Sequence, residues 1–236
     1  MKIVTWNVLH RIHAMNWCEP AIDAHPDEAT RIAAITKRVI ELDAGAVCLQ
    51  EVSGDQLASL RAGLPNATFY VHTYPRLPRI YRAERPSPLA DSNEHLVTIM
   101  NRVPTRRSQS ETYPTDKGKG FLLVELVDGL AIVNTHVSYG EQHAAQCGQL
   151  VSYVRSYAAA VIVGDFNEGR TICREELPGF TAAPPPVEKP TRPRGDGKND
   201  VIDHIFVSGC RATEVEVLPG RGLSDHNPVT AALVRD

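Results

Sequence analysis

The 236-residue sequence predicts a mixed α/β domain in which strands and helices form layers. Short apolar runs alternate with a few segments of helical periodicity, and long polar connections separate them. Hydrophobic residues make up 42% of the chain and charged residues 22%, which is typical of a soluble globular domain with a sizeable core. We find no internal repeat and no interdomain linker, so we interpret residues 1–236 as a single domain.

Apolar runs with lengths typical of strands predict the β-structure. The run at 46–49 is continuously apolar, which favours a strand buried on both faces, and it ends at Gln50-Glu51-Val52. Asp128-Gly129 separates two of the runs and predicts a β-hairpin, because this dipeptide favours a tight turn. The predicted strands are residues 3–8, 46–49, 96–100, 121–126, 130–135, 160–163, 201–207, 214–218 and 229–234.

Three segments have the periodicity of amphipathic helices. In residues 27–42, Ile35 and Val39 lie on one apolar face, and acidic residues occupy the first turn, where the helix dipole favours them. Residues 56–62 predict a short helix, and residues 141–157 predict a longer one.

Basic side chains gather in loops although the chain as a whole is acidic. The net charge of −3 and the isoelectric point near 6.3 argue against a protein that coats nucleic acid electrostatically. Segment 74–85 is nevertheless a candidate platform for phosphates and bases, with a solvated polar loop as the alternative. Its relevant residues are Tyr74, Arg76, Arg79, Tyr81, Arg82 and Arg85; further local charge comes from Arg106, Arg107, Lys117, Lys119, Arg192 and Arg194.

The N-terminal residues already have the pattern of a strand, and no apolar leader with a cleavage site precedes them. No apolar run approaches the roughly 20 residues that a membrane helix needs. We therefore expect a cytoplasmic protein without a membrane segment, and the sequence shows no evident protein partner.

Cysteine spacing argues against a disulfide framework and against a zinc site. The five cysteines are scattered, odd in number, and never spaced as C-x-x-C. Cys48 lies inside an apolar run, so we expect it to be a buried free thiol.

Polar clusters occur where predicted strands end, and their number is more informative than any one of them. Taken singly, Asn7 fits a turn residue and His136 a hydrogen-bonded structural histidine, while Glu51 fits a surface residue and a metal ligand equally well. Taken together they supply carboxylates for a divalent cation, amides for a phosphoryl oxygen, and imidazoles. The clusters are Trp6-Asn7, Gln50-Glu51, Asn134-Thr135-His136, Gly164-Asp165-Phe166-Asn167 and Ser224-Asp225-His226-Asn227.

Strand alternation adds a candidate ion pair. Ile202, His204 and Phe206 share one face of a predicted strand, and Asp203 lies on the other. A buried Asp203 needs a partner, and an imidazole such as that of His226 would give a carboxylate–histidine pair. We interpret His204 as a packing or surface residue.

In these motifs the chain resembles the endonuclease/exonuclease/phosphatase superfamily, the deoxyribonuclease-I-like proteins. The resemblance covers nearly the whole chain in order and spacing, and it implies an α+β fold, a four-layer α/β/β/α sandwich of two packed mixed β-sheets. The motifs are Thr5-Trp6-Asn7-Val8, Leu49-Gln50-Glu51-Val52, Asn134-Thr135-His136, Gly164-Asp165-Phe166-Asn167, Ile202-Asp203-His204-Ile205-Phe206 and Ser224-Asp225-His226-Asn227-Pro228-Val229.

The resemblance also implies roles for these residues in hydrolysis of a phosphoester by in-line attack of water. Glu51 would bind Mg²⁺ or Mn²⁺, with Asn7 and Asp225 near the metal or its waters. Asp165 would orient and deprotonate the water, and Asn167 would hold the phosphate. The remaining catalytic residues would be His226 paired with Asp203, and His136 assisting from the other side.

Two positions depart from the pattern of the family. Several members carry an acidic residue where this chain has Leu9, so one metal ligand is missing or not required. The segment Ser92-Asn93-Glu94-His95 replaces the usual Gly-containing pair, which leaves Glu94 or His95 as candidates to support His136.

Three functions fit the sequence. We favour a metal-dependent phosphodiesterase or nuclease. The alternative is a phosphatase acting on a small-molecule, sugar, inositol or lipid phosphate, since the motifs do not separate these substrates. A non-catalytic binding protein on the same fold is a third reading, against which the intact set of polar residues argues.

Overall fold

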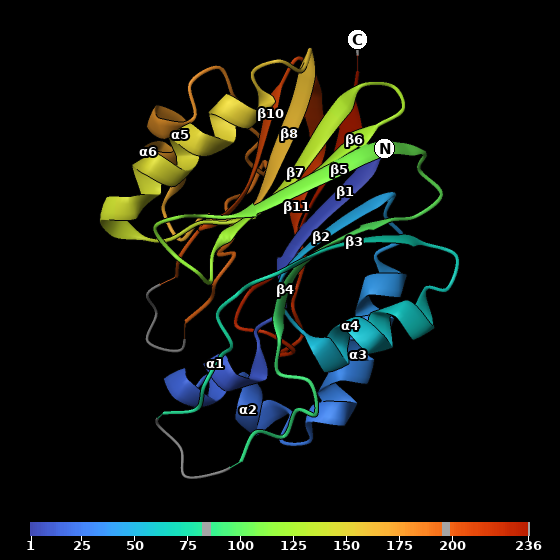
Figure 1. Cartoon of the computed structure of the whole chain (residues 1–236), viewed down its shortest axis with the longest axis vertical. Coiled ribbons are helices and arrows are strands. Elements are labelled where there is room, and N and C mark those ends of the chain that lie inside the picture. Colours follow the sequence, from blue (N-terminus) through green and yellow to red (C-terminus); the bar gives the residue numbers. More distant parts are fainter. Residues whose placement is uncertain (82–85, 195–198, 236) are drawn as a thin grey trace.

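The computed structural model describes residues 1–81, 86–194 and 199–235, and their strands form two mixed six-stranded sheets that pack face to face (Figure 1). The first sheet has the order β11 (Arg211–Val217), β12 (Val229–Val234), β1 (Lys2–Asn7), β2 (Ala46–Ser53), β4 (Glu94–Met100), β3 (Thr68–Thr73). The second has the order β5 (Thr105–Thr112), β6 (Gly120–Leu126), β7 (Leu130–His136), β8 (Ala159–Asp165), β10 (Asp203–Ser208), β9 (Thr181–Ala182).

Helices cover the outer face of each sheet (Figure 1). The first sheet carries α3 (Glu28–Glu41) and α4 (Gly54–Gly63); the second carries α5 (His143–Val154) and α6 (Arg170–Glu176). One apolar cluster fills the space between the sheets, and two more lie beneath the helices. The expected four-layer α/β/β/α sandwich is confirmed.

Two parallel strand pairs determine where polar residues meet. β1 pairs in parallel with β2 through the α3 crossover, and β7 with β8 through the α5 crossover. In each pair the carboxyl ends of the two strands lie side by side. The short helices α1 (Arg11–Trp17) and α2 (Ala21–Ala24) lie at this end of the sandwich, which is the lower end in Figure 1.

A buried amide pair links the two sheets just behind this edge. Gln50 Nε2 donates to Asn134 Oδ1 at 2.7 Å, and Asn134 Nδ2 donates to the carbonyl oxygens of Leu49 and Val97 at 3.1 and 3.0 Å. Both side chains are fully buried. Burying an amide without a hydrogen-bond partner costs free energy, so this network holds the two sheets in one position relative to each other.

Several predicted bounds were wrong. β2 continues through Glu51 to Ser53, and the helix predicted at 141–157 is a 3-10 turn, Gly140–Gln142, followed by α5, which ends at Val154. β11 starts at Arg211 rather than at 214. We predicted no separate element for the polar strand β5, because its residues, of which the central ones are exposed, show no apolar alternation.

The hairpin at Asp128-Gly129 joins β6 and β7 as predicted. Cys48 is a buried free thiol, and all five cysteines are unpaired with one another. Within the described ranges, no helix combines the length and apolar character that a membrane crossing requires.

Candidate active site

Asn7 lies at the centre of the polar cluster formed by the strand ends. Its Nδ2 donates to Glu51 Oε1 and to Asp165 Oδ2, both at 3.0 Å, so it joins the carboxylates of the two sheets. Its Oδ1 accepts the backbone N–H of Leu9 at 2.9 Å. Asn7 therefore positions both carboxylates, and Leu9 is a buried residue.

A bulge in β2 directs Glu51 into the cluster. The β2–β4 register shifts between Leu49 and Val52, and Glu51 has a φ of 56°, in the left-handed region that non-glycine residues rarely adopt. Glu51 Oε2 accepts the backbone N–H of His10 at 3.2 Å. Burial opposes the charge of Glu51, but His13, His136 and Lys119 outweigh it, so the pKa of this carboxyl lies well below its usual range.

Asp165 and Asn167 follow β8 at the point where it approaches β7 closely. A Cβ at Gly164 would lie 1.9 Å from Thr135 O, so only glycine allows this approach. Asp165 Oδ1 accepts the backbone N–H of Asn167 at 2.9 Å, and Asn167 Nδ2 donates to Val137 O at 3.0 Å. Asn167 has a φ of 54°, a second left-handed residue in the site.

Burial would raise the pKa of Asp165, yet the neighbouring side chains of His226 and His136 hold it well below its usual range. Asp165 therefore stays ionised at neutral pH. A carboxylate surrounded by this many donors is a weak base.

The structure contains the Asp203–His226 pair. His226 Nδ1 lies 2.8 Å from Asp203 Oδ2, and His226 Nε2 lies 3.8 Å from the carboxylates of both Asp165 and Asp225. Burial alone would lower the pKa of His226, but the three carboxylates outweigh it and raise the pKa to about 10. The imidazole is therefore cationic at neutral pH.

The loop that carries His226 is held against β1. Ser224 Oγ donates to Asn7 O at 2.7 Å and accepts the backbone N–H of His226 at 3.0 Å, while Trp6 Nε1 donates to His226 O at 2.9 Å. Arg31 on α3 donates to the carbonyl oxygens of Val8, Leu9 and Leu223, and its charge is balanced by Glu28. These bonds fix the two loops that border the site.

Lys119 is a site residue that sequence reasoning treated only as loop charge. Its ammonium group contacts Nε2 of His136, which also lies 3.3 Å from Asp165 Oδ2. Nδ1 of His136 has no hydrogen-bond partner among the described residues. The candidates from segment 92–95 lie elsewhere: Glu94 pairs with His13 at 3.1 Å, and His95 Nδ1 bonds to Thr73 Oγ1 at 2.9 Å.

Asp225 is paired with an arginine on the far rim. Arg192 Nε donates to Asp225 Oδ2 at 2.8 Å, and the same guanidinium donates to Glu19 at 3.0 Å. Among the groups of three or more possible metal-binding side chains in the described residues, one joins Asp165, Asp203 and His226. Glu51 and Asp225 do not belong to that group.

The residues of the site open into one cleft with a volume of about 1570 Å³. Its walls carry exposed aromatic side chains, Trp17 at 56% and Tyr81 at 65% exposed. Its rim also includes the cations Arg76, Arg79, Lys119, Arg192 and Arg194.

The segment 74–85 contributes to the cleft only in part. Tyr74 is 3% exposed, so its prediction as part of a binding platform was wrong. Arg82 and Arg85 lie outside the described residues. His204 is buried and packs between Phe166 and Phe206, which decides between its packing and surface readings.

The sequence matches the model of the Endonuclease/Exonuclease/phosphatase family over residues 4–226. The chain belongs to this family. Members of this family hydrolyse phosphoesters, in agreement with the sequence expectation. No curated protein matches the sequence.

Several solved structures share the fold at low sequence identity. A humanized TDP2 of D. rerio has a TM-score of 0.72 at 13% identity, covering 99% of this chain and 98% of its own. A functionally unknown conserved protein of Enterococcus faecalis has a TM-score of 0.69 at 17% identity over 100% of both chains. ANGEL2, a 2′,3′-cyclic phosphatase in complex with adenosine-2′,3′-vanadate, has a TM-score of 0.68 at 13% identity, covering 98% of this chain and 94% of its own.

Proposed function

We propose that the chain is a divalent-metal-dependent phosphodiesterase that acts on single-stranded nucleic acid by in-line attack of water. The observation that carries this proposal is the convergence of Glu51, His136, Asp165 and His226 at one cleft, with Asp203 behind His226. The exposed aromatics and arginines on the rim support a nucleic-acid strand, because stacking and backbone charge are the means by which proteins bind single strands.

The carboxylate of Glu51 fits a hard cation. It offers oxygen at the cleft, and oxygen ligands are those that Mg²⁺ and Mn²⁺ prefer. Asp225 lies at the same cleft but would have to leave Arg192 to bind the ion. Glu51 would hold the ion, with Asn7 fixing the position of its carboxylate. When bound, the ion would neutralise charge on the phosphoryl and leaving oxygens.

Asp165 would aim the attacking water and accept its proton. The lowered pKa makes orientation and charge the larger part of this role, because a weak base removes a proton poorly. Asn167 uses one N–H of its amide on Val137 O and keeps the second for a phosphoryl oxygen.

Two cationic side chains would bind the phosphoryl group from opposite sides. His226, charged at neutral pH and held at Nδ1 by Asp203, would donate from Nε2 to a phosphoryl oxygen. Lys119, beside His136, would add a positive charge next to the leaving oxygen.

A substrate panel tests the proposal. Purified protein is assayed with Mg²⁺, Mn²⁺ or EDTA on single-stranded DNA, RNA, abasic duplex, a 2′,3′-cyclic nucleotide, inositol phosphates and sugar phosphates. We expect metal-dependent cleavage of single strands to exceed turnover of the small phosphates. Preference for inositol or sugar phosphates would show that the protein is a phosphatase rather than a nuclease. Inactivity on every substrate would favour a non-catalytic binding protein.

A further inference from the structure

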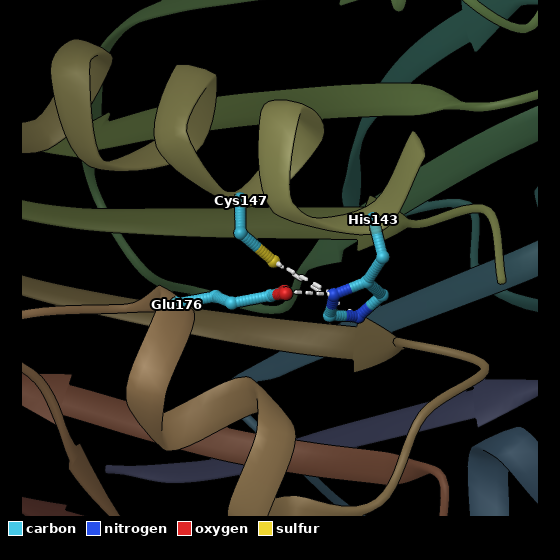
Figure 2. A group of neighbouring side chains, drawn as sticks. All are labelled: His143, Cys147 and Glu176. Atoms are coloured by element: carbon cyan, nitrogen blue, oxygen red, sulfur yellow. Dashed lines mark hydrogen bonds and ion pairs between the residues drawn. The ribbon is translucent and has the colours of Figure 1, made fainter. Parts of the chain in front are cut away.

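A second polar cluster lies under α5 and α6, on the outer face of the second sheet. It consists of His143 and Cys147 on α5 with Cys173 and Glu176 on α6, and we call it the helix-pair cluster. Figure 2 shows the side chains of His143, Cys147 and Glu176 pointing toward one another between the two helices. None of the four residues belongs to the candidate active site.

The spacing on each helix places both of its ligands on one face. His143 and Cys147 are four residues apart, and Cys173 and Glu176 are three apart, which are the two separations that bring helical side chains together. The sequence analysis argued against a zinc site because no C-x-x-C is present. That argument does not cover ligands divided between two helices.

The distance between Cys147 Sγ and His143 Nδ1 is that of two ligands of one metal ion. Cys147 Sγ lies 3.6 Å from His143 Nδ1, and Glu176 Oε2 contacts the same Nδ1. The ligand atoms of these three residues all lie within 4.8 Å of one another. A tetrahedral zinc ion with Zn–N of about 2.0 Å and Zn–S of about 2.3 Å separates N from S by about 3.5 Å. Cys173 Sγ lies 3.8 Å from Nε2 of the same imidazole, beside this group.

The surroundings of the cluster suit a closed site. Cys147 and Cys173 have no exposed surface, and His143 is 1% exposed. Burial raises the pKa of both thiols, that of Cys173 to about 12, so they are protonated without a cation. Apolar packing alone does not require the imidazole and the carboxylate of Glu176 at this position.

We propose that the helix-pair cluster binds one Zn²⁺ through His143, Cys147 and Glu176, and that Cys173, whose Sγ faces Nε2 rather than Nδ1 of the imidazole, turns toward the ion as the fourth ligand. The two thiols each lose a proton to solvent when the ion binds, the imidazole binds as the neutral form, and the Glu176 side chain turns from the imidazole to the metal. Thiolate and imidazole ligands select a soft or borderline cation over Mg²⁺. A closed site with four protein ligands is structural, so the ion would clamp α5 to α6.

The clamp would also act on the active-site loop. Cys173 Sγ donates to Glu168 O at 3.5 Å, and His204 Nε2 lies 2.9 Å from the same carbonyl. Glu168 follows Asn167 directly. Zinc on Cys173 would remove the S–H that donates to this carbonyl and leave it to His204, so ion binding would change the hydrogen bonding of the segment next to Asn167.

Cobalt spectroscopy on the reduced, metal-free full chain tests the site. Co²⁺ is titrated in excess Mg²⁺, and absorption is followed in the near-ultraviolet, where thiolate-to-cobalt charge transfer appears, and in the visible, where tetrahedral cobalt absorbs strongly. We expect both bands to saturate at one Co²⁺ per chain and to be abolished by Zn²⁺. Co²⁺ on the carboxylates of the cleft produces no thiolate band, so the two sites are distinguished.

Variants separate the cluster from other thiols. Cys147→Ser should remove most of the thiolate band and weaken Zn²⁺ binding by at least about 100-fold, since losing even an outer partner of a ligand costs about 10- to 100-fold. Glu176→Gln, at a partly exposed carboxylate, should weaken binding while leaving the fold intact. Cys210→Ser, a half-buried cysteine elsewhere, is the matched control and should bind as wild type.

Three results would overturn the proposal. They are the absence of a thiolate band in the reduced wild type, unchanged Zn²⁺ affinity in Glu176→Gln, and a Cys147–Cys173 disulfide in protein purified without reductant together with no metal binding after reduction. The last result would assign the two thiols to a redox pair instead.

Discussion

The candidate active site and the helix-pair cluster both use residues that follow or end β7 and β8. They differ in the atoms that could bind a metal and in their exposure to solvent. The first gathers carboxylates, amides and imidazoles at strand ends that open into a cleft. The second gathers nitrogen, sulfur and one carboxylate between two helices, where the thiols have no exposed surface. An open site with oxygen donors suits exchange of substrate and water, whereas a closed site with soft donors suits a permanent ion.

The largest expected effect is a loss of hydrolysis in a variant of the candidate active site that leaves metal binding by the helix-pair cluster unchanged. His226→Ala should lower kcat/KM for metal-dependent hydrolysis by about 10³-fold, or about 4 kcal/mol, because the variant loses the cation that faces the phosphoryl group. Its thiolate–cobalt band should be unchanged. His25→Ala changes a half-buried histidine that belongs neither to the candidate active site nor to the helix-pair cluster, and it serves as the control in the same steady-state assay. Equal turnover of both variants would remove His226 from the mechanism.

Loop positioning by Arg31 should matter only for the cleft. Arg31→Lys keeps the charge but loses the planar fork that reaches Glu28 and the carbonyls of Val8, Leu9 and Leu223, so we expect about 3 kcal/mol lower free energy of unfolding in urea. Activity should fall with it, whereas cobalt binding by the folded protein should not. Arg38→Lys on the same helix is the control, with a loss below about 1 kcal/mol. Equal losses in the two variants would contradict this role of Arg31.

His204 lies between the two regions, because its Nε2 and the thiol of Cys173 both contact the carbonyl oxygen of Glu168. The titration of His204 tests how deeply this imidazole is buried. Burial lowers its pKa to about 4 from 6.5, so the unfolded chain takes up its proton first as the pH falls. This shift makes the free energy of unfolding fall between about pH 6.5 and pH 4, by up to about 3 kcal/mol. His204→Gln should flatten that slope without abolishing it, because His10 has a similarly lowered pKa of about 4. Urea unfolding at pH 6.5 and 4.5 measures how the free energy of unfolding changes with pH. If His204→Gln has the same pH dependence as the wild type, His204 is not the titrating group.

The smallest effect concerns Lys119. Lys119→Met should lower kcat/KM by about 10-fold, since one positive charge beside His136 is lost while the other groups remain. Lys117→Met, at an exposed lysine two residues away, should leave kcat/KM unchanged. A loss of equal size in both variants would show that loop charge as a whole, rather than the contact with His136, is what matters.

The sequence predicted the fold and most members of the polar cluster because apolar runs and the polar residues that end them are local patterns. Asn7, Glu51 and Asp165 could be placed at strand ends in this way. The bulge at Glu51 could not, since it depends on how β2 pairs with β4. Lys119 was missed because nothing local distinguishes it from Lys117.

The remaining misses have the same physical origin. The pairing of Asp225 with Arg192 joins residues 33 apart through tertiary contact. Glu94 was considered as support for His136 but pairs with His13, on a helix too short to show a periodic signal. The helix-pair cluster was missed because its ligands are divided between α5 and α6, so no single segment contains a metal-binding spacing.

The most direct test of the central claim compares Asp165→Asn with Asp43→Asn on a single-stranded oligonucleotide in Mg²⁺. Asp43 is an exposed aspartate with a φ of 44°, a conformation that asparagine also adopts, so the control changes charge alone. The account predicts a loss of about 10³-fold in kcat/KM for Asp165→Asn, in protein that circular dichroism shows to be folded at the assay temperature, and wild-type turnover for Asp43→Asn. Wild-type turnover of a folded Asp165→Asn would contradict it.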